Sequence, residues 1–127
     1  MSEDVGIAEI DQTVTRARVA QEHYEKMGSQ ALFDKACQAV AWALMKPDRN
    51  QALSELAVAE TGLGRVEDKI RKNYNKTLGL MRDLKNVRSF GHISDDMNRG
   101  LSNYLRPKGV IAAIVPSTNP LATPVNN

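Results

Sequence analysis

The sequence is poor in the residues that build disulfides, aromatic platforms and membrane spans. It has one cysteine and one tryptophan, and aromatic residues make up 5% of its 127 positions. A single cysteine excludes an internal disulfide and is typical of a reducing compartment. No apolar run reaches the roughly 18 residues of a membrane-spanning helix, and Glu3 and Asp4 stand where a secretion signal would be basic. We therefore expect a cytoplasmic protein with no membrane partner.

A strong excess of one charge is also missing. Seventeen lysines and arginines face fifteen acidic residues, which gives a net charge of +2. A domain that binds a phosphate backbone is expected to be far more basic, so no nucleic-acid partner is predicted. The apolar fraction of 42% and the charged fraction of 25% are ordinary for a globular chain, and the length suits one domain at most.

Two helices are predicted before residue 47. From Val5 to Tyr24 the apolar residues recur at steps of three, four and seven, which is the period of one helix face. Ser29 is a suitable N-cap for a second helix, and Pro47 should end that helix near Lys46. The second helix has a wide apolar stripe that includes Cys37, so this thiol is interpreted as a small buried hydrophobic group with a raised pKa and not as a nucleophile.

Two further helices are predicted up to Leu84. The third has Asp48 as its cap and a left-handed glycine, Gly62 or Gly64, as its stop. The fourth covers residues 65–84 and has a thin apolar stripe. Its "EDKIRKN" segment offers basic groups for phosphates, but two acidic residues offset them and no aromatic residue accompanies them. We interpret the segment as a solvated helix face.

The pattern changes after residue 84. The segments "VRSFGHIS" and "LSNYLRPKG", separated by the turn-forming "DDMNRG", predict the two strands of a hairpin. "GVIAAIVP", residues 109–116, is apolar on both faces, as in a strand buried in a parallel sheet. Only seven residues follow Pro120, whereas a crossover to a parallel neighbour takes about a dozen. We therefore expect a segment of a larger α/β protein that ends just after its first sheet strand.

Two long motifs resemble one enzyme family. They are ETG-x-G-x-x-x-DK-x-x-KN, from Glu60 to Asn73, and P-x-GVIAAI-x-PSTNP, from Pro107 to Pro120. Together they resemble the N-terminal portion of the aldehyde dehydrogenase superfamily, within it the coenzyme-A-acylating branch. The continuation "NPLATPVN" is most similar to the acylating sulfoacetaldehyde dehydrogenases.

The resemblance implies a division of the chain. Residues 1–84 would form the N-terminal helical part of the dinucleotide-binding domain, and residues 85–108 the β-hairpin of the oligomerisation region. Residues 109–127 would supply the first sheet strand and an incomplete cofactor-site loop. The parent would be an α/β homo-oligomer, a dimer or a tetramer, while this segment is mainly α. The edges of the hairpin should be unsatisfied in the segment alone.

The resemblance also implies an activity. Members of the branch oxidise a short aldehyde with NAD or NADP and pass the acyl group to coenzyme A. Sulfoacetaldehyde is the expected substrate, with acetaldehyde or propionaldehyde as alternatives. The family's cysteine nucleophile lies beyond the matching segment, and Cys37 is not at its position, so this chain alone is expected to be inactive. The family uses the "EDKIRKN" region in structure, so we assign it no contact with cofactor or substrate.

The loop after the apolar run carries the predicted site. By the resemblance, Ile114, Val115, Pro116, Ser117 and Thr118 line the cofactor. The family's oxyanion-binding asparagine aligns with Thr118, and Asn119 follows it, so either residue is a candidate donor. The alternative for this loop is a capped turn that enters a helix. No metal site is predicted, because His23 and His92 are interpreted as separate surface residues. The rival to an enzyme segment is an autonomous helical interaction module whose tail docks on a partner.

Overall fold

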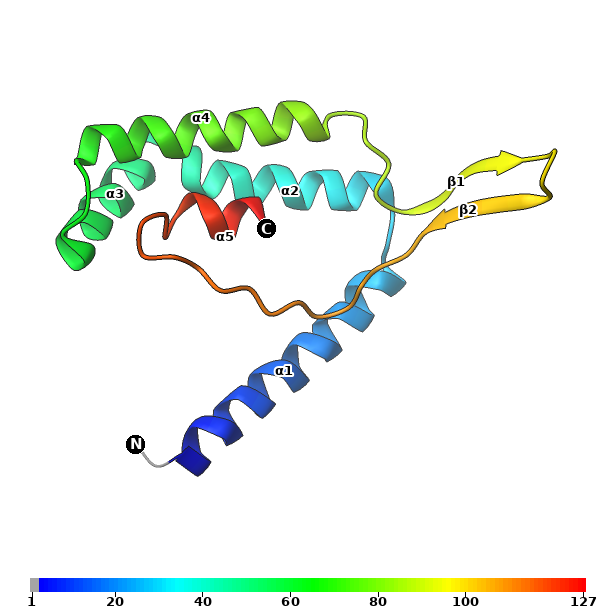
Figure 1. Ribbon diagram of the computed structural model, residues 1–127, viewed down its shortest axis with the longest axis horizontal. Coiled ribbons are helices and arrows are strands. Elements are labelled where there is room, and N and C mark those ends of the chain that lie inside the picture. Colours follow the sequence, from blue (N-terminus) through cyan, green and yellow to red (C-terminus); the bar gives the residue numbers. More distant parts are fainter. Residues whose placement is uncertain (1–2) are drawn as a thin grey trace. The chain divides into compact units, whose positions relative to one another are not determined.

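The computed structural model describes residues 3–127, and the chain divides into two compact units. One unit joins the chain up to Phe33 with Arg88–Ala112, and the other joins Asp34–Val87 with Ala113–Asn127. Within the described residues there are five helices and one two-stranded antiparallel sheet, labelled in Figure 1. None of these helices is long and apolar enough to cross a membrane. The expected mainly helical segment with a hairpin is thus confirmed.

The first unit contains α1 (Glu3–Lys26) and the hairpin of β1 (Gly91–Asp96) and β2 (Leu101–Leu105). The strands run antiparallel with Gly91 opposite Leu105, and a bulge or irregularity interrupts the register after His92. Asp96 organises the connecting turn, because its Oδ1 accepts hydrogen bonds from the backbone N–H groups of two turn residues. The predicted hairpin is confirmed.

The predicted first helix forms, but much of its apolar face is open. The side chains of Ile7 and Ile10 are 55% and 64% exposed. At the other end of α1, the ring of Tyr24 lies 4.8 Å from that of Phe33, which lies 5.4 Å from Phe90. This aromatic cluster packs the end of α1 and the start of the next helix against Phe90, the residue before β1.

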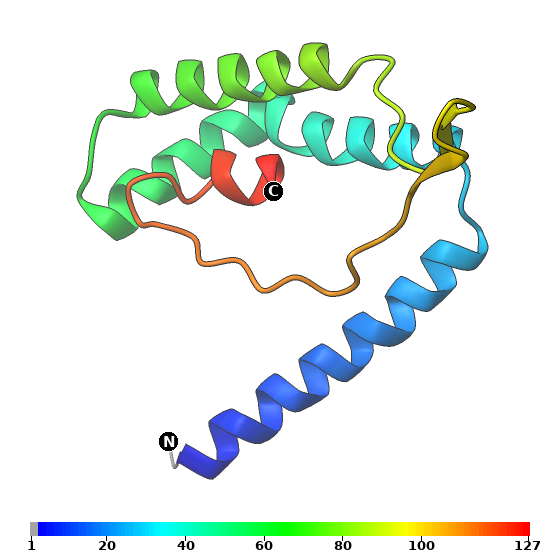
Figure 2. The same ribbon diagram turned by 45° about the vertical axis from the view of Figure 1, so that its right-hand side comes forward.

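The second unit is built around α4 (Val66–Leu84). Both α3 (Pro47–Thr61) and α5 (Ala122–Asn126) pack against it, as the ribbon in Figure 2 shows. The second helix, α2 (Gln30–Met45), begins in the first unit and continues into the second. The core of the second unit is small and half polar. Its buried apolar residues include Ala41, Leu44, Ala57 and Ala122. Its buried polar residues include Asn50, Ser54, Lys69, Asn73 and Thr77.

Two of the predicted capping residues are confirmed, and one is not. The Ser29 hydroxyl accepts a hydrogen bond from the Leu32 N–H at 3.2 Å, which confirms the predicted N-cap. Gly62 adopts φ 65° and donates its N–H to the Val58 carbonyl, which confirms the predicted stop of α3. The prediction of Asp48 as a cap was wrong. Pro47 occupies the first turn, where its missing N–H is not needed, so the helix begins before Asp48.

A hydrogen-bonded polar cluster joins α3 to α4. The Asn73 Nδ2 donates to Asn50 Oδ1 at 3.0 Å and to Ser54 Oγ at 3.2 Å. The Asn50 Nδ2 in turn donates to the Ile70 carbonyl at 3.0 Å. Buried polar groups are tolerated when they satisfy one another in this way.

The strand predicted at residues 109–115 does not form. These residues have no regular secondary structure, and Ile111 and Ile114 are 73% and 97% exposed. A strand exists only through hydrogen bonds to a neighbour, and the described residues supply none here. The expected burial of Cys37 was also wrong, because its thiol lies on an exposed face of α2 while Ala41 and Leu44 face inward.

Candidate functional site

The predicted cofactor loop forms a tight turn. The Asn119 N–H donates to the Pro116 carbonyl at 3.1 Å, which places Ser117 and Thr118 at the two corners of a β-turn. The chain then enters α5, whose first residue Ala122 is fully buried. The backbone therefore also has the form of the alternative described above, a turn that leads into a helix.

The loop residues differ in exposure. Ser117 and Thr118 are exposed. Ile114, Val115 and Pro116 are also exposed, Ile114 at 97% and Val115 at 40%. Asn119 is half-buried, and its Oδ1 is buried without a hydrogen-bond partner among the described residues. The turn thus brings two hydroxyls and one amide together at a single corner of the chain.

Lys72 of α4 holds this turn from outside the predicted site. Its Nζ donates to the Thr118 carbonyl at 3.3 Å, which engages the main chain and leaves the Thr118 hydroxyl available. Burial lowers the pKa of Lys72, and the positive charges of Lys69 and Lys76 lower it further. The interpretation of this segment as a solvated face was wrong for Lys72, which is half-buried, and for Lys69, which is buried.

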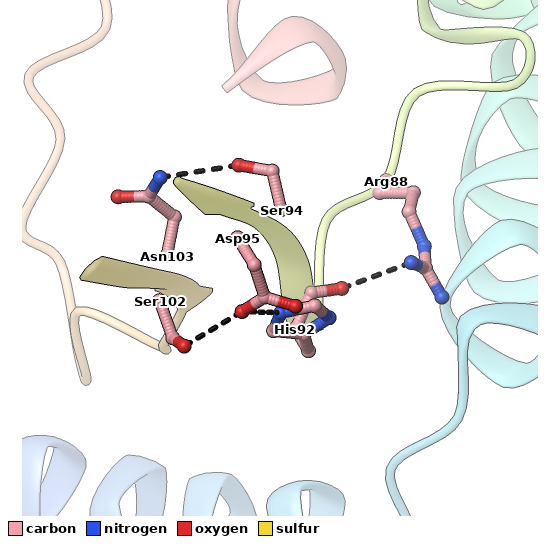
Figure 3. A network of polar contacts seen from close by, with 6 residues as sticks. All are labelled: Arg88, His92, Ser94, Asp95, Ser102 and Asn103. Atoms are coloured by element: carbon pink, nitrogen blue, oxygen red, sulfur yellow. Dashed lines mark hydrogen bonds and ion pairs between the residues drawn. The ribbon is translucent and has the colours of Figure 1, made fainter. Parts of the chain in front are cut away.

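The hairpin carries a second polar network, drawn in Figure 3. His92 Nε2 lies 2.8 Å from Asp95 Oδ1, and the Ser102 hydroxyl donates to the same oxygen at 2.6 Å. These bonds from Ser102 and His92 lower the pKa of Asp95. The imidazole also packs against the Tyr104 ring at 5.1 Å, so His92 is half-buried and paired, not solvated as predicted.

This serine, histidine and aspartate do not form a nucleophilic triad. A triad requires the imidazole between the hydroxyl and the carboxylate, so that it can take the hydroxyl proton. Here the carboxylate of Asp95 lies between the other two groups, and the Ser102 hydroxyl donates a hydrogen bond to this carboxylate and not to the imidazole. The neighbouring bond from Asn103 Nδ2 to Ser94 Oγ at 3.1 Å crosses the same pair of strands. The network therefore stabilises the hairpin.

Cys37 borders a cavity of about 360 Å³ formed by α2, α4 and α5. The side chains that line this cavity with it include Val40, Thr77 and Met81, and none of the lining side chains is acidic or basic. A nucleophilic thiol needs a base or a positive charge beside it. The surroundings of Cys37 thus offer no activation. Among the described residues, no group of three potential ligands could hold a metal ion.

Several curated proteins match most of this chain. The chain is 56% identical over 113 residues to the sulfoacetaldehyde dehydrogenase (acylating) of Cupriavidus necator. The aligned residues cover 89% of this chain and 23% of that protein. The chain matches the N-terminal portion of coenzyme-A-acylating aldehyde dehydrogenases. The resemblance read from the two motifs is confirmed.

Other aldehyde dehydrogenases match over a similar span. The sulfoacetaldehyde dehydrogenase of an Acholeplasma species is 39% identical over 117 residues, which cover 90% of this chain and 23% of that protein. The acetaldehyde dehydrogenase (acetylating) of Escherichia coli is 39% identical over 121 residues, which cover 94% of this chain and 24% of that protein. The chain therefore spans about a quarter of the length of these aldehyde dehydrogenases. No family model matches it.

Proposed function

We propose that this chain forms the N-terminal part of an NAD(P)-dependent, coenzyme-A-acylating aldehyde dehydrogenase that oxidises sulfoacetaldehyde. The observation that carries the proposal is the 56% identity over 113 residues to an acylating sulfoacetaldehyde dehydrogenase. The relatives at 39% include both a sulfoacetaldehyde and an acetaldehyde dehydrogenase, so the preference for the sulfonated substrate rests on the 56% match alone. The complete enzyme would be a cytoplasmic homo-oligomer, either a dimer or a tetramer, with coenzyme A as co-substrate.

The residues of the loop are chemically suited to a dinucleotide. Ribose hydroxyls and a carboxamide need hydrogen-bonding partners, and the exposed Ser117 and Thr118 provide hydroxyls. The backbone from Ile114 to Val115 has no strand partner among the described residues, so its N–H and C=O groups remain available. When bound, NAD(P) supplies the hydride acceptor. In this proposal, residues 114–118 hold its nicotinamide-ribose side.

The same turn would supply the donor for the reacting aldehyde. Negative charge develops on the aldehyde oxygen as a thiolate adds to the carbonyl carbon. Either the Thr118 hydroxyl or the Asn119 amide would donate a hydrogen bond to that oxygen. One donor of this kind contributes about 3–4 kcal/mol to the transition state. Lys72 supports this role by fixing the Thr118 carbonyl.

The experiment begins with the source DNA. We expect the reading frame to continue past Asn127 and to include a further cysteine in a loop of small residues. The complete protein should form NAD(P)H from sulfoacetaldehyde and coenzyme A faster than from acetaldehyde or propionaldehyde. Either Thr118→Ala or Asn119→Ala should lower kcat by about 10²- to 10³-fold. Gln38→Ala is a suitable control, since Gln38 is exposed on α2.

Three results would contradict the proposal. They are a frame that stops after residue 127, NAD(P)H formation by the 127-residue chain alone, and full activity in both loop variants. A higher kcat/KM for acetaldehyde would retain the enzyme class and change its substrate.

A further inference from the structure

An open cleft of about 350 Å³ lies at the N-terminal end of α4. The side chains and backbone that border it include Gly64, Arg65, Asp68, Lys69, Lys72 and Thr118. It adjoins the loop described above only through Thr118. Its chemistry is set by the two lysines.

Lys69 is mostly buried and borders the cleft, but its ammonium nitrogen keeps some access to solvent. Its side chain is part of a residue that is only 6% exposed, and no hydrogen bond or ion pair joins it to another described residue. It extends beside Gly64, since a Cβ at that glycine would lie 3.6 Å from Lys69 Cε. An ammonium group with few water contacts and no bonded counter-charge is a favourable partner for an anion that enters the cleft.

Lys72 adds a second positive group on the same border. Its Nζ gives one hydrogen bond to the Thr118 carbonyl, which leaves two of its three hydrogens available. The repulsion between Lys69 and Lys72 is one cause of the lowered pKa of Lys72. A bound anion between them would relieve that repulsion.

The acidic side chain on the border does not neutralise the lysines. Asp68 Oδ2 accepts from Arg65 Nε at 2.9 Å, and its Oδ1 accepts from Arg71 Nη2 at 2.6 Å. These two guanidinium groups lower the pKa of Asp68 and satisfy its charge. Glu67 is also in the first turn of α4, but it is exposed and does not border the cleft.

The backbone at the start of α4 supplies further donors. The helix has 19 residues, and its N-cap Arg65 makes no capping hydrogen bond from its side chain. The first backbone bond at this end joins the Lys69 N–H to the Arg65 carbonyl. The N–H groups of residues 66–68 therefore have no intrahelical partner, and such helix ends favour anions. Of these three residues, Asp68 borders the cleft.

We propose that this cleft binds a tetrahedral oxyanion, namely the sulfonate or phosphate group of a small molecule. Either group presents several acceptor oxygens, which can bind two ammonium groups and backbone N–H donors at once. A sulfonate would come from the substrate and a phosphate from a cofactor. The proposal goes beyond the proposed function, because anion binding requires neither a thiolate nor a hydride acceptor.

The test is a binding titration of the 127-residue chain at constant ionic strength. Sodium ethanesulfonate and methyl phosphate are added separately, with chloride as control, and the amide and ε-CH₂ resonances of Lys69 and Lys72 are followed by NMR. We expect saturable shifts with at least one oxyanion and none with chloride. Tighter binding of ethanesulfonate would indicate a substrate group, and tighter binding of methyl phosphate a cofactor group.

Charge-removing variants locate the site. Lys69→Met and Lys72→Met should each weaken binding about tenfold, because each removes one charge-assisted contact. Lys76→Met is the matched control, since Lys76 is exposed on the same helix and does not border the cleft, and its affinity should stay within about twofold. If Lys69→Met does not fold, reductive methylation replaces it: the bound anion should protect Lys69 and not Lys76.

The proposal is overturned if neither oxyanion saturates, or if all three variants bind like the unmodified chain. Its failure is distinct from failure of the proposed function. Saturable binding by a protein without dehydrogenase activity would refute the function alone. An active enzyme whose Lys69 and Lys72 do not respond to oxyanions would refute the cleft alone.

Discussion

Asn73 provides a sharp test of the polar interface between α3 and α4. Its side chain is 1% exposed and donates two hydrogen bonds, to Asn50 Oδ1 and to Ser54 Oγ. In Asn73→Ala both bonds are lost and a small cavity replaces the amide. Each bond contributes about 1 kcal/mol, and the cavity adds to the loss, so unfolding should become easier by about 2–3 kcal/mol.

The measurement is urea and thermal unfolding followed by circular dichroism at the helix band. A loss of this size lowers Tm by roughly 10 °C in a chain of this length. Asn75→Ala is the matched control, because Asn75 is exposed two residues further along α4 and should change stability by less than about 0.5 kcal/mol. Equal stabilities of the two variants would refute the reasoning.

A double-mutant cycle separates the shared bond from the rest. Asn50→Ala removes the acceptor of the Asn73 amide and also the donor to the Ile70 carbonyl. Because both single variants break the same Asn50–Asn73 bond, the double variant should cost about 1 kcal/mol less than the sum of the two. Strict additivity would show that the two amides do not interact in solution.

Three further predictions concern other parts of the chain. Gly62→Ala should destabilise by about 1 kcal/mol because φ is 65° there, whereas Gly79→Ala in the interior of α4, with open space around it, should stabilise by up to about 1 kcal/mol; equal signs would contradict this. Hydrogen bonds from Ser102 and a histidine lower the pKa of Asp95, so the contribution of Asp95 to hairpin stability is present above the ordinary titration range of an aspartate and is lost as pH falls through the lowered pKa. Ser102→Ala should raise the pKa of Asp95 in an NMR titration, and an unchanged pKa would count against the network. Because Ile111 and Ile114 expose their apolar side chains, we expect the chain to self-associate in sedimentation velocity, and Ile114→Lys should reduce this with Tm unchanged; oligomers of the same size in this variant would contradict it.

The elements of the fold could be predicted from local signals. A serine before a helix and a glycine after one act through the adjacent backbone alone, so Ser29 and Gly62 were placed correctly. The hairpin was predicted for a similar reason, because its turn residues and strands are neighbours in sequence. Such signals require no knowledge of what packs on what.

Burial could not be predicted in the same way. The apolar stripe of α4 is thin, and the sequence did not indicate that Lys69 is mostly buried there. On α2, the sequence did not indicate that Cys37 is exposed. The cluster of Asn50, Ser54 and Asn73 is satisfied by partners about twenty residues away, and the pairing of Asn50 with Asn73 has no local signature. The strand expected at residues 109–115 failed because a strand is a property of two segments, of which one is missing among the described residues.

The residues of the candidate site stay a prediction. Its residues from Ile114 to Asn119 were proposed from the resemblance, and the structure gathers the last three at one turn. Lys72 lies in the first of the two motifs, and its contact with Thr118 in the second was not predicted, because the two positions are 46 residues apart. A motif block rich in lysines beside another block rich in small polar residues would have been a weak signal for that contact.

The order in which a ribosome makes the chain gives the polar interior of the second unit another consequence. Helix α4 is synthesised well before α5, so the surface that α5 covers is bare while the hairpin and the tail are still being made. Among the buried residues of α4, Thr77 borders the same cavity as residues of α5, and its hydroxyl is compatible with water. A leucine at position 77 would expose a larger apolar surface during this interval, whereas the hydroxyl of Thr77 keeps that surface partly hydrated until α5 is made.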